Sequence, residues 1–450
     1  MPGRTFRTVA TMVAALTVAG SLSACSGVGW AGNSGPNTIR VLMVNNPQMI
    51  DLQKLAPEFT KETGIKVSFT TLPEDDLRDK ASQEFSSQAH QYDVATLSNF
   101  EIPIYSKNNW LESMDQYLAK DTAFDQADIL KPIAQSLSGS DGKIYGEPFY
   151  GESSFLMYRK DIFQAKGLTM PAHPTWQQVA DLAAKADGAE PGMKGICLRG
   201  QPGWGQVLAP LTTVVNTFGG TWFNKDWSAQ VSAPPFKEAT NFYIDLVRKH
   251  GEIGAAQSGF VECLTALEQS KAAMWYDATS AAGSLEAKGS PVAGKIGYAP
   301  APVVKTKTSG WLYAWSWAIE KGGKHLSNSW KFVSWASSQA YEKLVGDKLG
   351  WANVPAGKRA STYSNPDYLK VASAFAKPTL EAIQSANPTS PGVQPRPTGG
   401  IQFVDIPEFT DFGTKVSQDI SSAIAGKESV DSALSNGQTL ASAVGKLYAG

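Results

Sequence analysis

The stretch TIRVLMVNNP, residues Thr38–Pro47, decides the fold class because it joins a compact apolar run to a turn. The apolar run predicts a buried strand, and Asn-Asn-Pro predicts the turn that ends it. Leu52, Leu55, Ala56 and Phe59 then follow at helical spacing, and Gly64 marks the end of that helix. The folded part of the chain therefore begins with a strand followed by a helix.

The alternation of strand and helix continues downstream. Lys66–Leu72 alternates like a second strand, and Pro73–Asp76 opens a helix with acidic residues in its first turn, which suits the helix dipole. Asp93–Leu97 is a third short strand. Strands alternating with helices predict an α/β fold with a parallel sheet and crossover helices.

The same pattern returns in the second half of the chain. A capping box at Thr175–Gln178 opens a helix that runs through Lys185, and Gly203–Phe218 and Pro234–His250 have long helical patterns. Further strands are predicted at Gly195–Arg199, Lys271–Asp277 and Ile296–Pro300. Two α/β lobes are the natural interpretation.

Polar residues follow several of these strands. Asn45 and Asn46 follow the first strand, Asn99 the third, and Asp277 ends a strand of the second half. Ligands in open α/β sheets bind beyond the carboxyl ends of the strands, so these positions are candidates for a binding site.

The N-terminus has the pattern of an export signal. Arg4 and Arg7 precede an uncharged apolar run from Val9 to Leu22, which is too short to span a bilayer. Leu-Ser-Ala-Cys, ending at Cys25, matches the bacterial lipobox, in which the Cys thiol is acylated and becomes the new N-terminus. An ordinary cleaved signal with a chance Cys is the alternative. The sequence predicts a signal peptide at 1–24, a lipid anchor at Cys25 and a flexible tether at 25–37, with the folded part at the outer face of the cytoplasmic membrane.

Bulk composition sets the other limits. Without residues 1–24 the chain keeps 426 residues, enough for two domains, and with 42% hydrophobic and 18% charged residues a packed core is expected. A net charge of −1 offers no electrostatic basis for binding nucleic acid or anionic lipid. No second apolar run approaches spanning length, so the membrane is expected to be reached only through the lipid.

Two of the three cysteines remain once Cys25 is set aside. Cys197 and Cys263 are an even pair in an exported protein, which favours a disulfide, although two free buried thiols are the alternative. The four histidines are scattered, with no ligand spacing near either Cys. No metal and no cofactor is expected.

Aromatic residues gather where a ligand is expected. Trp311, Tyr313, Trp315 and Trp317 alternate along one face of a strand, opposite mostly small residues. Packing between lobes would explain some of them equally well. Further tryptophans lie beside glycines or polar residues, at Trp204, Trp275 and Trp351. Aromatic rings with Asn, Asp, Glu and Arg suit a neutral polyhydroxylated ligand better than a charged one.

Three motifs carry a resemblance to a known family. They are YGEPFYGE at Tyr145–Glu152 with LMYRKDIF at Leu156–Phe163, KAAMW at Lys271–Trp275, and the strand that opens with Gly310-Trp311 and ends with Ala318-Ile319. With them the chain resembles the extracellular solute-binding proteins of ABC importers, the maltose-binding-like family, over nearly the whole mature length. It departs from the family pattern at Arg159, where Asn is commoner, and at Ser270, where Gly is usual.

Finer motifs are similar to the sugar-alcohol branch of that family. They are ICLRG at Ile196–Gly200 with PGWG at Pro202–Gly205, ECL at Glu262–Leu264, MWYDAT at Met274–Thr279, GWANVP at Gly350–Pro355 and QFVDIPEF at Gln402–Phe409. The resemblance implies a monomeric binding protein for a polyol, with a ligand between two lobes that close on it. The lobes are expected at 38–149 plus 296–338 and at 150–295 plus 339–450. The family resemblance also implies a membrane permease and a cytoplasmic ATPase as partners.

Two carboxylates match the family pattern position by position. Glu152 falls on the pocket carboxylate and Asp277 on a polar ligand contact, and a buried carboxylate accepts strong hydrogen bonds from vicinal hydroxyls. A hinge salt bridge is the alternative for Glu152, and a helix N-cap before 279–286 is the alternative for Asp277. Arg396 either lines the pocket or holds Asp277 or Glu152. The full set of expected ligand contacts is Asn45, Asn46, Glu74, Asn99, Tyr150, Glu152, Trp204, Trp275, Asp277, Trp311, Trp315, Trp351 and Arg396.

Other functions remain as alternatives at this point. A mono- or disaccharide could replace the polyol in the same kind of pocket. A glycoside hydrolase would need a pair of catalytic carboxylates, and no such pair is marked in the sequence. A surface scaffold would explain a lipid anchor but not the repeated α/β lobes.

Overall fold

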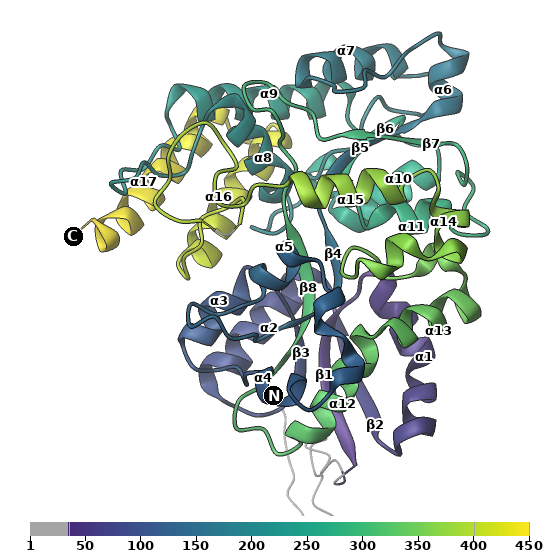
Figure 1. Ribbon diagram of the computed structural model, residues 1–450. Helices are drawn as coiled ribbons and strands as arrows, with labels where there is room; N and C mark the ends of the chain where they lie inside the picture. Colours follow the sequence, from purple (N-terminus) through teal and green to yellow (C-terminus); the bar gives the residue numbers. More distant parts are fainter. Residues whose placement is uncertain (1–34, 36, 400, 450) are drawn as a thin grey trace, which may run out of the picture. The chain divides into compact units, whose positions relative to one another are not determined.

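The computed structural model describes residues 35, 37–399 and 401–449 (Figure 1). Contacts divide the chain after Gly35, and the part that follows forms one compact unit. The predicted signal peptide at 1–24, Cys25 and most of the predicted tether lie outside the described residues.

Five strands form the first sheet, in the order β2-β1-β3-β8-β4. They are β1 (Thr38–Val44), β2 (Lys66–Leu72), β3 (Val94–Ser98), β4 (Glu147–Glu152) and β8 (Tyr313–Ile319). The predicted buried first strand is confirmed, because Val41, Leu42, Met43 and Val44 have no exposed surface. Strand β1 lies inside the sheet, between β2 and β3, and its apolar side chains are buried on both faces. Helices therefore cover the sheet on both sides.

Three strands form the second sheet, in the order β6-β5-β7. They are β5 (Ser154–Arg159), β6 (Met274–Ala278) and β7 (Ile296–Pro300). Only Ser153 separates β4 from β5, so the chain leaves one sheet and enters the other almost without a turn. In Figure 1, β4 and β8 are the long strands that connect the lower lobe, built on the first sheet, with the upper lobe, built on the second.

The helices fall into three groups along the chain. Before β4 come α1 (Pro47–Thr63), α2 (Glu74–Ser87), α3 (Glu101–Lys107), α4 (Asp115–Leu118) and α5 (Lys131–Ser136). Between β5 and β7 come α6 (Lys160–Ala165), α7 (Trp176–Ala186), α8 (Leu208–Phe218), α9 (Pro234–His250), α10 (Phe260–Glu268) and α11 (Ala281–Glu286). After β8 come α12 (Leu326–Ser337), α13 (Gln339–Leu349), α14 (Pro366–Ala372), α15 (Ala376–Ser385), α16 (Phe409–Ile424) and α17 (Val430–Tyr448). Short 3₁₀ helices lie at Thr122–Phe124, Gln126–Asp128, Ala255–Gln257, Trp351–Asn353 and Ser361–Ser364.

The α/β class and the two lobes are confirmed, but the parallel sheet is only partly right. β1 pairs in parallel with β2 and β3, whereas β8 is antiparallel to β3 and β4, and the second sheet is antiparallel throughout. The reason is the crossing between lobes. A strand that returns from the second lobe enters the first sheet at the carboxyl ends of its parallel strands, so it must run against them.

Several local predictions also differ from the structure. Ile296–Pro300 pairs with β5 in the second sheet, so the return crossing lies between Pro300 and Tyr313 rather than before 296. Helix α13 packs on α12 and α1 of the first lobe, although 339–450 was expected in the second lobe. Gly195–Arg199 is not a continuous strand and makes only an isolated bridge, from Cys197 to Trp275. The capping box of α7 is confirmed, because the Thr175 and Gln178 side chains each bond the other's backbone N–H.

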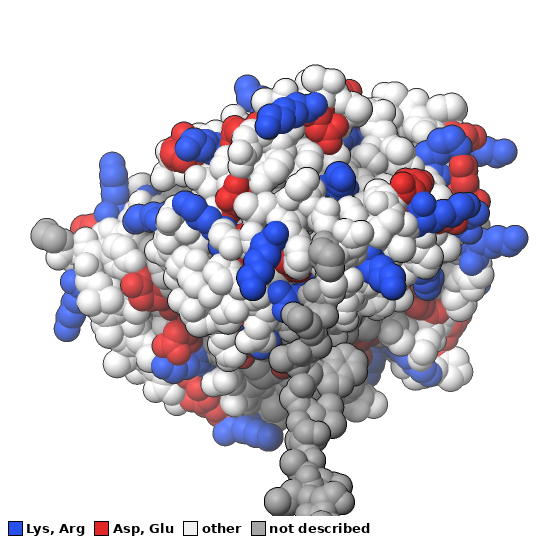
Figure 2. Space-filling view, turned by 90° about the horizontal axis from the view of Figure 1, so that it is seen from below, with Lys and Arg blue, Asp and Glu red and all other residues white. Residues whose placement is uncertain are grey.

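The visible surface matches the small net charge. Figure 2 shows Lys and Arg interspersed with Asp and Glu over the described part of the face seen from below, without a large field of one sign. Among the described helices, none combines the length and the apolar character that a membrane span requires.

Candidate functional site

A cavity lies where the two lobes meet. Its first wall comes from the carboxyl ends of β1 and β2, its second from the segments around β6 and α10, and its floor from the crossing strands. The lining residues are Asn46, Glu74, Glu152, Arg199, Gly205, Ala209, Phe260, Ala278, Ser280, Trp311, Tyr313, Trp315, Gln402 and Phe403.

The first lobe contributes Asn46 and Glu74. Asn46 is the residue just before α1, and its Nδ2 donates to the hydroxyl of Tyr150 at 2.7 Å. Glu74 is the first residue of α2, directly after the turn that follows β2. Both therefore lie where the parallel strands end, as the strand-end rule predicts.

Glu152 ends β4 and lies on the floor of the cavity. The hydroxyl of Ser280 donates to its carboxylate, and burial raises the pKa of Glu152 to about 8 although that hydrogen bond and Arg199 oppose the shift. Within the described part of the chain Glu152 makes no salt bridge, so the hinge alternative finds no support in these contacts. A buried carboxyl with a single hydroxyl partner has free acceptor capacity for a ligand.

Among the described lining residues, Arg199 is the one that presents a guanidinium. Asp277 holds it in a two-pronged ion pair, with Nε 2.7 Å from Oδ2 and Nη2 2.5 Å from Oδ1. Nη1 donates to the carbonyl of Gly205 at 3.0 Å, and Asp277 also accepts from Nε1 of Trp275 at 3.0 Å. Burial opposes the charge of Arg199, but Asp277 raises the pKa of Arg199 above its ordinary value. The guanidinium is therefore a fixed, charged donor.

Asp277 has a role that neither sequence interpretation foresaw. It is fully buried and is not among the lining residues, so it lies behind Arg199. It is also not the N-cap of the following helix, because α11 begins at Ala281 after Ser280. The structure shows it as the partner that orients Arg199.

The aromatic ladder divides along its strand. Trp311, Tyr313 and Trp315 line the cavity. Trp317 lies on the same face of β8 but packs in the core of the first lobe, with its ring centroid 5.1 Å from Phe149 and 5.3 Å from Phe332. The division follows from the crossing, because β8 starts at the cavity and runs into the sheet. The binding-site interpretation therefore fits Trp311, Tyr313 and Trp315, and the packing interpretation fits Trp317.

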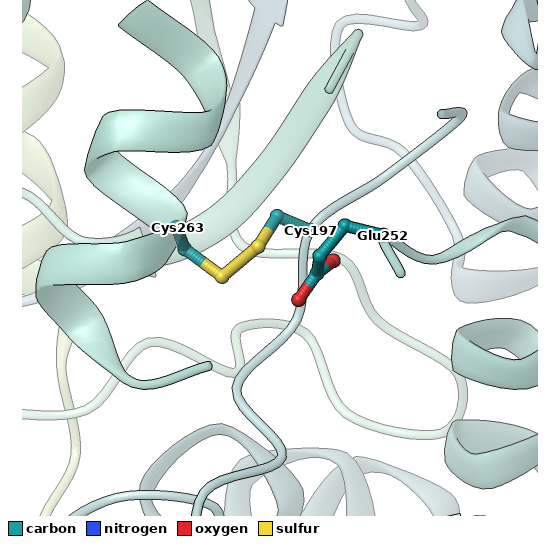
Figure 3. Close-up of side chains that lie close together, drawn as sticks. All are labelled: Cys197, Glu252 and Cys263. Atoms are coloured by element: carbon teal, nitrogen blue, oxygen red, sulfur yellow. A yellow bond between two sulfur atoms is a disulfide. The ribbon is translucent and has the colours of Figure 1, made fainter. Parts of the chain in front are cut away.

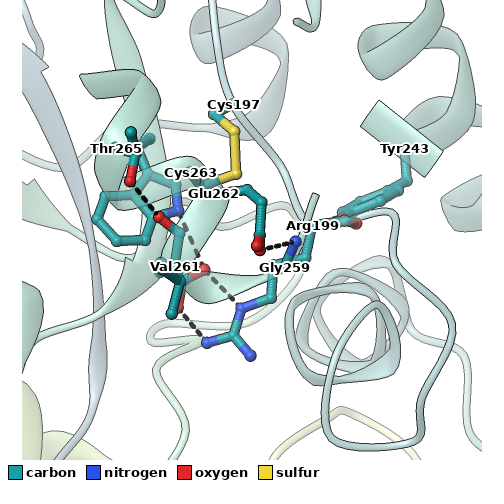
Figure 4. The surroundings of a disulfide bond; sticks show 10 residues. Cys197, Arg199, Tyr243, Gly259, Val261, Glu262, Cys263 and Thr265 are labelled. Carbon is teal, nitrogen blue, oxygen red and sulfur yellow. Dashed lines mark hydrogen bonds and ion pairs between the residues drawn. A yellow bond between two sulfur atoms is a disulfide. The ribbon is translucent and has the colours of Figure 1, made fainter. Parts of the chain in front are cut away.

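A disulfide joins Cys197 to Cys263, with Cα atoms 5.6 Å apart (Figure 3). The predicted bridge is thus present in the structure. Cys197 lies two residues before Arg199, and Cys263 lies one turn after Phe260 on α10, so the bridge ties two cavity-lining segments together (Figure 4). The carboxylate of Glu252 lies within 4.8 Å of both sulfurs, but sulfurs that are bonded to each other offer no thiolate to a metal.

Three predicted residues of the first lobe and crossing strand lie beside the cavity rather than on its wall. Asn45 is exposed, and its backbone N–H donates to the carbonyl of Leu72. The side chain of Asn99 bridges backbone groups of Leu312 and Ala314 and so fixes the start of β8. Tyr150 bonds Asn46 and lines a neighbouring smaller cavity.

Four predicted residues of the second half also lie off the wall. Trp204 packs against Arg78 of the first lobe. Trp275 lies behind Arg199, where its Nε1 donates to Asp277. Trp351 lies in a 3₁₀ turn and packs over Gly346. Arg396 takes neither of its predicted roles.

The guanidinium of Arg396 donates to the carbonyls of Thr398, Ile401 and Gln402, and burial lowers the pKa of Arg396 to about 10. It shapes the loop that carries Gln402 and Phe403 into the cavity. Its contribution to the wall is therefore indirect.

The sequence interpretation missed several lining residues, and Arg199 is the most important. The signal was available, since Arg199 ends the predicted strand at 195–199 just as Asn46 and Asp277 follow theirs. Ser280, Gln402 and Phe403 carry no comparable signal, because loops bring them to the wall. The lining residues outside the expected set of contacts are Arg199, Gly205, Ala209, Phe260, Ala278, Ser280, Tyr313, Gln402 and Phe403, of which Tyr313 belongs to the predicted aromatic ladder.

The cavity combines hydrogen-bonding groups of both kinds with aromatic faces. Glu74 and Glu152 are acceptors, Arg199 is a donor, and Trp311 and Trp315 offer broad apolar surfaces. Since Arg199 is already neutralised by Asp277, the wall offers no uncompensated positive charge for an anion. This chemistry suits a small, neutral, hydroxyl-rich molecule.

Comparisons with known proteins show which family the chain resembles. The family model described as bacterial extracellular solute-binding protein matches residues 46–343. A mannitol-binding protein of Pseudomonas aeruginosa is 40% identical over 407 residues, covering 90% of this chain and 92% of that protein. An erythritol/L-threitol-binding protein of Mycolicibacterium smegmatis is 26% identical over 345 residues, covering 71% of this chain and 70% of that protein.

Solved structures share the fold. An ABC transporter solute-binding protein from Agrobacterium vitis with bound D-mannitol superposes with a TM-score of 0.89 at 44% identity, covering 91% of this chain and 99% of that one. A ribitol complex from Agrobacterium radiobacter has a TM-score of 0.79 at 24% identity, covering 90% of this chain and 98% of that one, and shows the shared fold.

Proposed function

This chain belongs to the bacterial extracellular solute-binding protein family, and we propose that it captures a sugar alcohol for an ABC importer. The observation that carries the proposal is the cavity, where Glu74, Glu152 and Arg199 converge beside Trp311 and Trp315. Acceptors and donors that line one cavity match the alternating roles that vicinal hydroxyls can play. Aromatic faces match the C–H surface of a polyol backbone.

Mannitol is the leading candidate among the polyols. The 40% identical relative is named a mannitol-binding protein, and the 44% identical structure holds D-mannitol. Mannitol and sorbitol differ at one stereocentre, so the placement of one hydrogen-bond partner decides between them. A mono- or disaccharide is the alternative ligand.

Export and anchoring are part of the same proposal. The lipobox at Cys25 would hold the protein at the outer face of the cytoplasmic membrane, with residues 25–37 as the tether. A permease with a cytoplasmic ATPase would receive the ligand. The protein would act as a monomer, without a cofactor and without catalysis.

A thermal-shift screen of the full chain tests the proposal. The panel contains hexitols, pentitols, tetritols, hexoses and disaccharides. A ligand at 100 times its Kd adds about 2.7 kcal/mol to the free energy of unfolding, so the true ligand should stand out clearly. A shift with mannitol or another polyol supports the proposal, a shift only with sugars favours the alternative, and cleavage of an added oligosaccharide would indicate a hydrolase.

A further inference from the structure

The lobes also meet beside the cavity, at Trp204. This residue belongs to the second lobe, where its ring packs on Phe403 and Phe409 with centroids 5.6 Å and 6.3 Å away. Its two closest aromatic and cationic neighbours belong to the first lobe. The ring lies 4.4 Å from the centroid of Phe100 and 4.1 Å from the guanidinium carbon of Arg78. Trp204 therefore inserts from one lobe into the other while lying outside the cavity lining.

Arg78 is held rigidly within the first lobe. Its Nη2 donates to Glu74 at 2.7 Å and to the hydroxyl of Tyr313 at 2.6 Å, and its Nη1 donates to Glu101. The side chain is almost completely buried. Its planar face is thus presented to Trp204, and the same bonds orient Glu74 and Tyr313, which both line the cavity.

Glycines on both sides of Trp204 allow the lobes to come this close. A Cβ atom on Gly205 would lie 2.4 Å from Oε1 of Glu74 and 3.0 Å from Nε of Arg78. A Cβ atom on Gly203 would lie 2.6 Å from Oδ1 of Asp75. All of these close neighbours belong to the first lobe, so glycine at positions 203 and 205 allows the two lobes to approach each other this closely.

We infer that Arg78 and Trp204 form an interlobe latch that sets how long a bound ligand is retained. Binding proteins of this architecture hold ligand between lobes that move relative to one another. A contact made only when the lobes meet adds to ligand affinity without touching the ligand. Arg78 and Trp204 are therefore positioning residues, and the inference rests on the proposed polyol function.

A double-mutant cycle on the full chain tests the latch. The variants are Arg78→Lys, which keeps the charge but loses the planar face, Trp204→Leu, and the double variant. Each single change should raise the Kd for mannitol about tenfold, which is about 1.4 kcal/mol. The double variant should fall well short of the product of the two single effects, because both changes remove the Arg78–Trp204 contact, although Arg78→Lys also loosens Glu74 and Tyr313. Multiplied effects, near one hundredfold in the double variant, would overturn the latch.

Kinetics separates a latch from a merely structural role. Stopped-flow measurements should show faster ligand release in Trp204→Leu with little change in the association rate. Trp222→Leu is the matched control, because Trp222 is equally buried but packs on Phe236, Phe409 and Phe412 of the second lobe alone. The control should lose stability and keep the wild-type release rate. An equal acceleration in both variants would overturn the latch.

Gly205→Ala tests the close approach of the lobes from the second lobe, because its Cβ atom would crowd Glu74 and Arg78. It should weaken mannitol binding at least tenfold, whereas Gly399→Ala, whose Cβ would meet only ordinary contacts at 3.4 Å and beyond, should not. Wild-type affinity in Gly205→Ala would contradict the inference.

Failure of the latch and failure of the proposed function give different results. If the wild type binds mannitol and the variants bind equally well, the latch is wrong and the function stands. If the wild type binds no polyol, the proposed function is wrong, and small-angle scattering of the unliganded chain tests the latch instead. A larger radius of gyration in Trp204→Leu than in the wild type supports the latch, and identical curves overturn it.

Discussion

Arg199 and Asp277 form a buried two-pronged ion pair at the wall of the cavity, with Nη2 2.5 Å from Oδ1 and Nε 2.7 Å from Oδ2. Only Arg199 lines the cavity, while Asp277 lies behind it and also accepts from Trp275. The pair explains how a charged group can serve a neutral ligand. The guanidinium is neutralised within the protein, so its remaining donor capacity can serve hydroxyls.

Asp277→Asn should therefore weaken both binding and folding. Removing one partner of a buried pair leaves an uncompensated charge and costs about 3–5 kcal/mol of stability. Polyol affinity should fall at least tenfold, because Arg199 loses its orientation. Calorimetric titration and chemical denaturation of the unliganded protein measure the two effects.

The matched control is Asp161→Asn. Asp161 forms an equivalent pair with Arg159 but is 39% exposed and lies away from the cavity. The variant should also lose stability, because the side chain of Arg159 is only 3% exposed, but it should keep the wild-type polyol affinity. Unchanged polyol affinity in Asp277→Asn would remove Arg199 from the proposed site.

Glu152→Gln should change how stability depends on pH. Burial raises the pKa of Glu152 to about 8 from an ordinary value of 4.5, so the folded protein keeps a proton that the unfolded chain has already lost. Stability then falls as pH rises from about 4.5 to about 8, by up to about 1.4 kcal/mol per pH unit for this group. The variant has no proton to lose, so its decline with pH should be shallower than that of the wild type.

Glu147 supplies the control for that measurement. Burial raises the pKa of Glu147 to about 8 as well, but it lies within the sheet and not on the cavity wall. Glu147→Gln should flatten the pH dependence similarly and leave polyol affinity unchanged, whereas Glu152→Gln should also bind more weakly. Equal pH slopes in Glu152→Gln and the wild type would show that Glu152 is not buried as a neutral acid.

Trp315 and Trp317 should respond in opposite ways to substitution. Trp315 lines the cavity, so Trp315→Leu should lower polyol affinity about tenfold. Trp317 is fully buried in the first lobe, so Trp317→Leu should cost about 2–4 kcal/mol of stability and leave affinity near the wild-type value. Titration calorimetry and thermal unfolding of both variants measure this, and a larger affinity loss in Trp317→Leu would contradict the division of the ladder.

The disulfide should stabilise the second lobe strongly. Cys197 and Cys263 are 66 residues apart, so the chain-entropy model assigns the bridge about 4 kcal/mol. Replacing both cysteines with serine should lower the Tm markedly, and a reductant should then have no further effect. A wild-type Tm that is insensitive to reductant, with both thiols free on alkylation, would contradict the bridge.

The anchor is tested by Cys25→Ala. Without the lipobox cysteine the chain should not be acylated and should leave the membrane fraction. Fractionation of cells that produce each form measures this. Continued partitioning of Cys25→Ala into detergent would contradict the lipoprotein proposal.

Site residues at strand ends and in family motifs could be predicted from the sequence, because both signals lie in short local stretches. Asn46 lines the cavity, as expected from its place after β1, and Glu152, predicted from its motif, lines it too. Arg199 ends a predicted strand and so could have been a candidate, but its orientation toward the cavity depends on Asp277, a residue 78 positions away on another strand. Local pattern cannot show which of two charged residues faces the ligand and which lies behind it.

The tryptophans show the same limit. Trp204 lies beside two glycines, which is a pattern that suits a ligand platform, yet its ring faces Arg78 of the other lobe. Trp317 continues the periodicity of Trp315 but lies deeper along β8, where the lobe core replaces the cavity. The period of two fixes the face of a strand and does not fix where along that face the cavity ends.

The central claim is that this protein binds a sugar alcohol in the cavity between its lobes. The most direct measurement is calorimetric titration of the full-length wild type, freed of any co-purified ligand, with D-mannitol and, separately, with sorbitol, arabitol, glucose and maltose. We predict one site per chain for at least one polyol, at micromolar Kd or tighter, with weaker or no binding of the two sugars. Binding of none of the polyols, or tighter binding of a sugar than of every polyol, would contradict the claim.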